Sequence, residues 1–335
     1  MANLKLDDFK PNNDIFYKSC MHNSIIPIIN HFHEDILRLL INDIYCYQFD
    51  EAKKGVKFKI ESYVVENEEE VLKSMNIGIN KIYESQNVLG NIKESIRDGK
   101  PIIIYVDCYF LSFRSSAYKK EHLIHPILVY GYNDENQTFN VIEQRYKDSL
   151  IYEETTIPYN EIEEGYKYYV NNLNDKNNCP YYEFYKIKKN NEYFDANSEN
   201  YVSRLKEKLI KNIDEKNLEI NRGLQSWELV VENYIDITKD EYELNIYADE
   251  LIETINNIIK NKKVQLFMFN SIGGEYLKAG NIVGKIIGNW EDIRATIARY
   301  KFSQSYNKNL IELSINLIKE IVELEKEIFY IIKRN

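Results

Sequence analysis

The sequence predicts an α+β fold followed by an all-helical region, and three observations carry this prediction. An apolar, helix-like run begins just after Cys20. Four strand-like segments follow between residues 101 and 155, separated by polar turns. Beyond about residue 192, apolar residues recur at helical spacing with little interruption. A helix followed by an antiparallel sheet is the order of an α+β domain.

The first predicted domain spans residues 1–192, and its elements follow from local patterns. The expected helices and strands, in chain order, are a helix from Asn23 to Ile44, an alternating strand at Val56, Phe58 and Ile60, helical segments near 67–85 and 90–98, strands at 101–107, 125–131, 138–143 and 150–155, a helix near 159–168, and a strand at 181–186. The turn at 133–136 is rich in Asn and Asp, so the two strands beside it form a hairpin.

The second predicted domain spans residues 193–335 and begins after the polar stretch 188–192. Helices are expected near 198–215, 218–236, 243–262, 264–280, 281–300 and 306–333. The last helix carries an apolar stripe, formed by Leu310, Leu313, Leu317, Ile321, Leu324, Ile328 and Ile331. This stripe is expected to pack within its own bundle, and the seam of a homodimer is the alternative.

Composition narrows the class of protein. With 335 residues, 44% of them hydrophobic, the chain is expected to bury a sizeable core. A net charge of −10 argues against nucleic acid as the main partner. No uncharged apolar run reaches the roughly 18 residues of a membrane span, and the first residues are polar, so we expect no membrane partner and a cytoplasmic location. The four cysteines lack paired spacing, which predicts free thiols and no metal.

Cys20 is the candidate nucleophile because it precedes the first predicted helix. The backbone N–H groups and the dipole at a helix start favour a charged sulfur, and a nearby histidine lowers the thiol pKa further. A cysteine nucleophile also needs a base, and the base needs an acceptor that orients it.

His125 and Glu143 are the candidates for these two roles. His125 begins one strand of the predicted hairpin and Glu143 ends the other, so the hairpin brings them together. Asp107, at the end of another strand, is the alternative orienter, and Glu143 is favoured because of the hairpin pairing. His122 is the reserve candidate for the base.

These residues also carry a family resemblance. The arrangement of Cys20, the segment from His125 to Asp134 and the segment from Phe139 to Glu143 resembles the papain-like fold, in the branch that includes bacteriocin leader peptidases. It is most similar to the butirosin biosynthesis acyltransferase family. Further similar segments are Val106-Asp-Cys-Tyr-Phe-Leu111, Gly223-Leu-Gln-Ser-Trp227 and Gly288-Asn-Trp-Glu291.

The resemblance implies an acyltransferase. Family members take an acyl group from the phosphopantetheine thioester of an acyl or peptidyl carrier protein, hold it on the cysteine and pass it to a small-molecule amine. The expected product is an amide of secondary metabolism, such as an antibiotic. No cofactor of the chain's own is implied, because the phosphopantetheine arrives on the carrier. The helical domain would exclude water and shape the amine site.

Further site residues are expected from the resemblance and from their positions near the inferred cleft. Peptidases of this fold place a glutamine shortly before the cysteine as an oxyanion donor, and none precedes Cys20. The side chain of Asn13 or Asn23 is the expected substitute, with the Cys20 backbone N–H as the second donor. Tyr109 and Tyr130 are candidates for substrate contact. A basic cluster of Arg114, Lys119 and Lys120 is a candidate dock for the acidic carrier.

Two other functions remain open at this point. A cysteine peptidase or amidohydrolase would use the same three residues, because the chemistry up to the acyl-enzyme is shared. A binding protein that kept the fold without catalysis is the second alternative.

Overall fold

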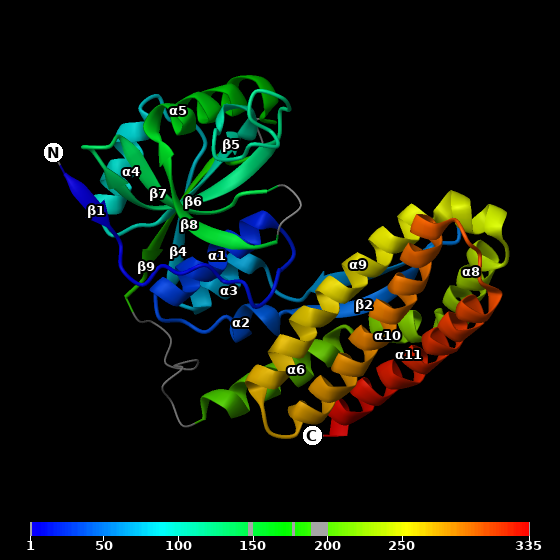
Figure 1. Cartoon of the computed structure of the whole chain (residues 1–335). Coiled ribbons are helices and arrows are strands. Elements are labelled where there is room, and N and C mark those ends of the chain that lie inside the picture. Colours follow the sequence, from blue (N-terminus) through cyan, green and yellow to red (C-terminus); the bar gives the residue numbers. More distant parts are fainter. Residues whose placement is uncertain (1, 147–149, 176–177, 189–199, 335) are drawn as a thin grey trace. The chain divides into compact units, whose positions relative to one another are not determined.

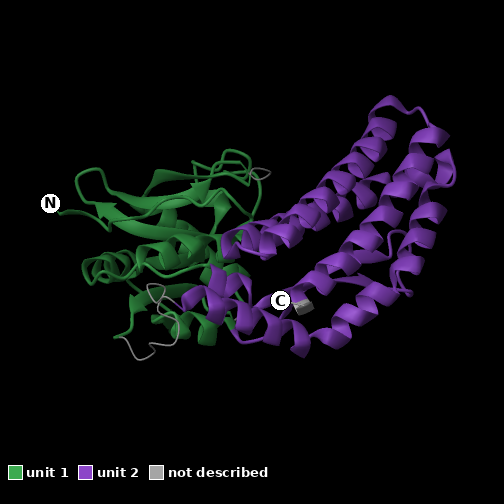
Figure 2. Ribbon diagram, turned by 90° about the horizontal axis from the view of Figure 1, so that it is seen from below, with its two compact units in different colours: residues 1–36, 68–198 green, residues 37–67, 199–335 purple. Residues whose placement is uncertain are grey.

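The computed structural model describes residues 2–146, 150–175, 178–188 and 200–334 (Figure 1). The chain forms two compact units (Figure 2). Unit 1 contains residues 1–36 and 68–198, and unit 2 contains residues 37–67 and 199–335. The predicted domain boundary after residue 192 lies outside the described residues.

Unit 1 is built on one antiparallel sheet. Among the described residues the sheet has seven strands: β1 (Asn3–Lys5), β4 (Ile77–Ile82), β5 (Ile102–Asp107), β6 (Ile124–Asn133), β7 (Thr138–Gln144), β8 (Tyr152–Pro158) and β9 (Tyr181–Lys186). Their order is β4-β9-β5-β6-β7-β8, and β1 pairs with β6. The predicted α+β class is therefore confirmed for this unit, with its helix-then-antiparallel-sheet order.

Helices cover the sheet of unit 1 (Figure 1). They are α1 (Cys20–His31), α3 (Glu68–Ser74), α4 (Val88–Arg97) and α5 (Tyr159–Tyr168), and a π-helical turn at Tyr169–Leu173 follows α5. Apolar residues of α4 and α5 join alternate residues of β5, β6 and β7 in one core, which includes Ile92, Ile104, Ile127, Val141 and Ile162. Helix α1 packs against β6, the strand that carries His125.

The predicted hairpin is present as β6 and β7. Leu128 pairs with Ile142, and side chains alternate along each strand, so His125 and Glu143 lie on the same face of the sheet. Strand β5 pairs with the other edge of β6, and there Val106 lies opposite His125 while Asp107 lies opposite Ile124. Asp107 therefore belongs to the opposite face from His125.

Two predicted helices of the first region are wrong in part. Helix α1 ends at His31, where the run was expected to continue to Ile44, and His33 adopts a positive φ of 57° just beyond it. A left-handed residue at this position ends a helix. The segment expected to be helical near 67–85 forms α3 and then the strand β4, and Asn76, with φ of 57°, makes the turn between them.

Unit 2 is mainly helical, as predicted. Its elements are α2 (Leu37–Leu40), β2 (Asp43–Phe49), β3 (Phe58–Val64), α6 (Tyr201–Glu215), α7 (Asn217–Gln225), α8 (Trp227–Thr238), α9 (Glu241–Ile272), α10 (Tyr276–Ser303) and α11 (Lys308–Arg334). The break between α9 and α10 falls at Gly273 and Gly274, both at positive φ, and was not predicted there. The inner face of α11 includes Ile318, Ile321 and Ile328, whereas Leu313 of the predicted stripe is 59% exposed.

The β2–β3 hairpin belongs to unit 2, although its sequence position suggested the first domain. The reason is its contacts with the helices of this unit. Tyr47 packs its ring against Trp227 at 4.4 Å between centroids, and its hydroxyl accepts a hydrogen bond from Nε1 of Trp290 at 3.2 Å. The side-chain amide of Asn212 donates to the carbonyl of Ile41, just before β2, at 2.8 Å, and that of Asn233 donates to the carbonyl of Gly55, in the turn between β2 and β3, at 3.1 Å.

No helix in the described part of the chain is long and apolar enough to cross a membrane.

Candidate active site

Cys20 is the first residue of α1, directly after the N-cap residue Ser19. The loop before it is fixed by the buried side chain of Asn23. The side-chain nitrogen of Asn23 donates to the carbonyls of Tyr17 at 2.9 Å and Ser19 at 2.7 Å. The side-chain oxygen of Asn23 accepts from the Tyr17 N–H at 3.1 Å. Lys18, between them, has a φ of 50°. The sequence around Cys20 thus holds the thiol at a helix N-terminus, where a thiolate is favoured.

His125 connects Cys20 to Glu143. The thiol of Cys20 hydrogen-bonds the His125 ring. The Nε2 atom of His125 donates to Oε1 of Glu143 at 2.9 Å. Since Nε2 is used in this bond, Nδ1 is the ring atom left for the sulfur. The three residues that the sequence proposed as nucleophile, base and orienter therefore meet in one hydrogen-bonded chain.

The electrostatics of this chain favour a charged pair. Burial raises the pKa of Cys20, but the hydrogen bond and charge of His125 outweigh it, and the net pKa lies below the usual thiol value. Burial lowers the pKa of His125, whereas the charge of Glu143 and the hydrogen bonds of the ring with Cys20 and Glu143 raise it to about 9. Both shifts favour a thiolate beside an imidazolium, which is the reactive form of a cysteine nucleophile.

Arg114 supports Glu143 from within the protein. Its side chain is 2% exposed, and Nη1 lies 3.6 Å from Oε1 of Glu143 and donates to Sγ of Cys108 at 3.9 Å. This corrects the expectation that Arg114 is part of a surface dock for a carrier, because a buried guanidinium cannot meet a partner. The sequence did not predict the contact of Arg114 with Glu143. Arg114 lies between β5 and β6, where no strand pairing relates its position to that of Glu143.

Asp107 does not orient His125, the alternative role that the sequence analysis proposed for it. Its Oδ1 accepts from the backbone N–H groups of Tyr109 and Leu123, each at 3.0 Å, and its Oδ2 accepts from Nδ1 of His122. Asp107 therefore orients His122 and closes the loop after β5. Neither Asp107 nor the reserve base His122 takes part in the chain from Cys20 to Glu143.

The two asparagines proposed as oxyanion donors are engaged elsewhere. Both amide hydrogens of Asn23 are used by the loop before Cys20. The amide of Asn13 donates to the carbonyl of Tyr152 at 3.0 Å, and its oxygen accepts from the Tyr152 N–H at 2.8 Å. The backbone N–H of Cys20 lies in the first turn of α1, where N–H groups have no partner within the helix, and its role as an oxyanion donor stays a prediction.

Tyr152 itself approaches Cys20. Tyr152 is 4% exposed, and burial and the charge of Cys20 raise its pKa. Its hydroxyl oxygen has no hydrogen-bond partner among the described residues. No feature of the sequence distinguishes it from the other tyrosines, of which the chain has 28 in all. The register does not identify it either, because Tyr152 pairs with Gln144 and so belongs to the face opposite Glu143.

A family comparison agrees with the sequence-based resemblance. Residues 43–144 match the family described as butirosin biosynthesis protein H, N-terminal. The predicted family resemblance is confirmed. The match includes His125 and Glu143, and Cys20 and the helices of unit 2 lie outside it.

The chain was also compared with solved structures and with curated proteins. One solved structure, described as a C39-like peptidase from Bacillus anthracis, is 12% identical to this chain. The similarity covers 56% of this chain and 100% of that one, with a TM-score of 0.34. A comparison with curated proteins gave no match.

Tyr109 and Tyr130, the two tyrosines proposed for substrate contact, lie in different surroundings. Tyr109 belongs to a segment that is similar to the butirosin family. Tyr109 stacks on His122 at 4.5 Å between centroids, and Tyr168 stacks on the same imidazole at 4.7 Å. Tyr130 is 1% exposed, and its hydroxyl donates to Glu154 at 2.8 Å. Tyr130 therefore has no surface to offer a substrate, which corrects that expectation.

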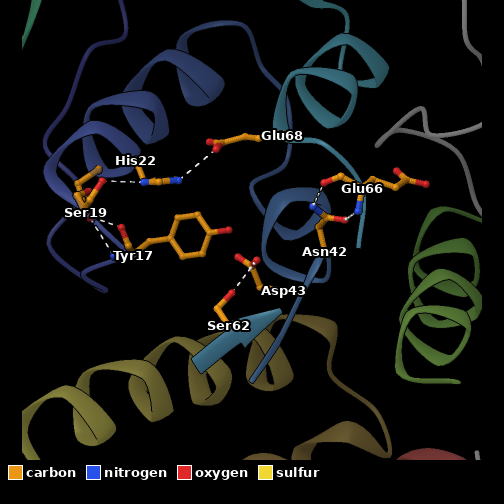
Figure 3. A network of polar contacts seen from close by, with 9 residues as sticks. Tyr17, Ser19, His22, Asn42, Asp43, Ser62, Glu66 and Glu68 are labelled. Carbon is orange, nitrogen blue, oxygen red and sulfur yellow. Dashed lines mark hydrogen bonds and ion pairs between the residues drawn. The ribbon is translucent and has the colours of Figure 1, made fainter. Parts of the chain in front are cut away.

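A second polar network starts beside the nucleophile (Figure 3). The Ser19 hydroxyl lies 2.7 Å from Nδ1 of His22, and Nε2 of His22 lies 3.1 Å from Oε2 of Glu68. Burial raises the pKa of Glu68, but the hydrogen bond and charge of His22 bring it below the usual value. This network ties the first turn of α1 to the start of α3. Within the described residues, no group of three His, Cys, Asp or Glu side chains is arranged to hold a metal.

Proposed function

We propose that the protein is a cysteine-dependent acyltransferase that moves an acyl group from a carrier-protein thioester to an amine and so forms an amide. The observation that carries this proposal is the hydrogen-bonded chain from Cys20 through His125 to Glu143. It supplies a thiolate with a matched acid-base group, which acyl transfer through a thioester requires.

In the first half-reaction, the Cys20 thiolate attacks the carbonyl carbon of the carrier's thioester. The carbon–sulfur bond to phosphopantetheine breaks, and the departing sulfur takes a proton from His125. The acyl group is then held on Cys20, and His125 is neutral. Exchange of one thioester for another is nearly isoenergetic, so Cys20 needs no external energy source for this step.

In the second half-reaction, the amine attacks the acyl-Cys20 thioester. Neutral His125 accepts the proton that the nitrogen loses, and Glu143 stabilises the imidazolium that forms. Cys20 leaves as a thiolate, which restores the starting charged pair. Aminolysis of a thioester is downhill, because the amide product is more stable.

The butirosin family match supports an amine as the acceptor. That family is named for the biosynthesis of butirosin, and the matched segment contains both His125 and Glu143. A peptidase or amidohydrolase would pass the same acyl-enzyme to water.

Intact-protein mass spectrometry tests this proposal. The chain is incubated with a carrier protein bearing an acyl-phosphopantetheine arm, or with the matching N-acetylcysteamine thioester, and then with a panel of primary amines. We expect a mass increase equal to the acyl group, its absence in Cys20→Ala, and its discharge as an amide when an amine is added.

The matched control is Cys46→Ala, because Cys46 is also a free thiol but is 3% exposed with a pKa that burial raises to about 12. This variant should acylate like the parent. Release of free acid at the same rate with and without amines would assign the hydrolase instead. Failure of Cys20 to acylate would reject both enzymes and favour a binding role.

A further inference from the structure

We propose that Ser19, His22 and Glu68 form a second triad, in which the Ser19 hydroxyl is a nucleophile that hydrolyses carboxylic esters. His22 is the base of this triad, and Glu68 is the positioning residue for His22. The activity is separate from the amide formation proposed for Cys20 and does not depend on it. All three residues belong to unit 1, and Figure 3 shows how they lie.

The hydrogen bonds of this group follow the order of a serine triad. Oγ of Ser19 lies 2.7 Å from Nδ1 of His22, and Nε2 of His22 lies 3.1 Å from Oε2 of Glu68. An ionised carboxylate only accepts hydrogen bonds, so Nε2 carries the proton of the neutral imidazole and Nδ1 has the lone pair. The Ser19 hydroxyl therefore donates to Nδ1, as a serine nucleophile does when a histidine takes its proton.

The chain from Cys20 to Glu143 uses the same ring atoms. There too, Nε2 of the histidine bonds a glutamate, at 2.9 Å, and Nδ1 is left for the nucleophile. Ser19 and Cys20 are adjacent in the sequence, so two neighbouring residues each have a histidine and a glutamate of their own. The two sets share no residue, and one can therefore be tested after the nucleophile of the other has been removed.

The Ser19 hydroxyl does not serve as the cap of its helix. Ser19 is the N-cap residue of α1, where a serine side chain ordinarily accepts a hydrogen bond from a backbone N–H of the first turn. Its side chain makes no such bond and contacts His22 instead. The N–H groups of Cys20 and Met21 directly follow Ser19 in the first turn, where N–H groups have no partner within the helix. They are the available donors for the negative oxygen that forms when Ser19 attacks an ester.

The nucleophile of this triad is open to solvent, and its partners are held in place. Ser19 is exposed, whereas the side chains of His22 and Glu68 are 20% and 31% exposed. The buried ring of Tyr17 packs edge-on against the His22 ring, with 5.4 Å between centroids, and so restricts its rotation. Glu68, whose pKa lies below its usual value, is ionised at neutral pH. An ester can therefore reach the hydroxyl while the base and the carboxylate keep their positions.

Hydrolysis proceeds in two steps. The Ser19 oxygen attacks the carbonyl carbon of the ester and passes its proton to Nδ1 of His22; the bond from this carbon to the alcohol oxygen breaks, and that oxygen takes the proton from Nδ1. Water then attacks the acyl-Ser19 carbon and gives a proton to Nδ1, and Ser19 leaves and regains a proton from the same atom. Glu68 stabilises the imidazolium in both steps. Because Ser19 is open to water, acyl-Ser19 is discharged and does not accumulate.

The test uses the full chain with Cys20→Ala, so that this thiol contributes nothing. Absorbance follows the hydrolysis of p-nitrophenyl acetate. Intact mass and peptide mapping follow a fluorophosphonate, which phosphonylates activated serines, releases fluoride and leaves a stable adduct. We expect turnover of the ester and one adduct, on Ser19. Adding His22→Gln should lower both rates by about 100- to 10,000-fold, the usual contribution of a general base. Glu68→Gln should lower them by about 10- to 100-fold, as expected for loss of one charge-assisted hydrogen bond.

The chain offers a matched histidine and a matched serine as controls. His31 lies at the other end of α1, where its Nδ1 is 2.8 Å from a backbone carbonyl oxygen, and His31→Gln should leave both rates unchanged. Ser303 is also exposed, but its hydroxyl donates to a backbone carbonyl of its own helix at 2.8 Å, so it should carry no adduct. Circular dichroism establishes that each variant is folded. If His22→Gln is not, Ser19→Ala decides, because it should abolish the turnover and the adduct.

The outcomes separate this proposal from the proposed function. If Ser19 reacts no faster than Ser303, or if His22→Gln leaves its rate unchanged, the triad is rejected and its contacts only join α1 to α3. That result does not bear on Cys20, which is absent from the tested chain. If Cys20 fails to acylate in the parent while Ser19 reacts as expected, the proposed function is rejected and the ester hydrolase stands.

Discussion

Nε2 of His125 lies 2.9 Å from Oε1 of Glu143, and both side chains are buried, at 7% and 1% exposure. The two residues are 18 positions apart and meet because one hairpin places them on the same face of neighbouring strands. The contact occupies Nε2, so Nδ1 is the ring nitrogen left for Cys20. It also supplies the negative charge that holds the imidazole protonated.

Replacing Glu143 with Gln should weaken the nucleophile. The amide keeps the shape of the side chain but removes the charge, so the pKa of His125 falls and that of Cys20 rises. Loss of a charge-assisted hydrogen bond of this kind corresponds to a decrease of about 10- to 100-fold in acylation rate at pH 7. Stopped-flow or quenched mass spectrometry of Cys20 acylation measures this.

Asp107→Asn is the control for the alternative orienter. The carboxylate of Asp107 closes a loop and bonds His122, so its loss should lower thermal stability and leave in place the midpoint pH at which iodoacetamide alkylates Cys20. A midpoint shift as large as that of Glu143→Gln would mean that Asp107, and not Glu143, orients His125.

The activity should depend on pH with a basic limit set by His125. Its imidazolium is the acid of the first half-reaction, and its pKa is about 9 in the folded protein against an ordinary 6.5. Acylation should therefore fall as the pH rises through about 9, and the limb should move to lower pH in Glu143→Gln. A rate that stays constant up to pH 10 would contradict this assignment.

The same pKa has a consequence for stability. Because the folded-state pKa is raised, the stabilisation from protonated His125 is complete below pH 6.5 and is lost as the pH rises through about 9. Urea titrations at pH 6 and pH 9.5 should show a lower free energy of unfolding at the higher pH. The difference between the two pH values should shrink in His125→Ala.

Arg114→Met should destabilise unit 1 strongly. Methionine fills a similar volume, but it removes the guanidinium at 3.6 Å from the buried carboxylate of Glu143 and leaves His125 as its remaining cationic neighbour. Breaking a buried ion pair by removing one partner costs roughly 3–5 kcal/mol. Urea denaturation measures the loss, and the double variant Arg114→Met with Glu143→Gln should recover part of it. A loss below about 1 kcal/mol would show that the pair is not structural.

The sequence predicted the His125–Glu143 contact because hairpin geometry follows from a polar turn and two apolar strands. It did not predict the end of α1, because the apolar run beyond Asn23 continues without a break into α2 and β2, which belong to unit 2. Local periodicity does not show which unit a hairpin joins. Tyr47 enters unit 2 because Trp227 and Trp290, about 180 and 240 residues further along, form its pocket.

The sequence did not predict the positions of Arg114 and Tyr152 for a related reason. Arg114 lies in a loop, where no register relates it to Glu143. Tyr152 is held by Asn13, a residue 139 positions away that looked like an oxyanion donor. Both make contacts with residues far away in the sequence, and such contacts leave no periodic pattern in the chain.

Two glycines of unit 2, both in segments that resemble the butirosin family, should respond to alanine in opposite ways. A Cβ at Gly223 in α7 would lie 2.7 Å from the carbonyl oxygen of Tyr47 in β2. That backbone cannot retreat cheaply, so Gly223→Ala should cost about 1–3 kcal/mol of unfolding free energy. At Gly288 in α10, a Cβ meets nothing within 4 Å outside its own helix, so alanine should add about 0.5–1 kcal/mol. Thermal unfolding of the two variants against the parent measures both. Equal melting temperatures would mean that the β2–β3 hairpin does not pack tightly on α7, and that the assignment of residues 37–67 to the helical unit is wrong.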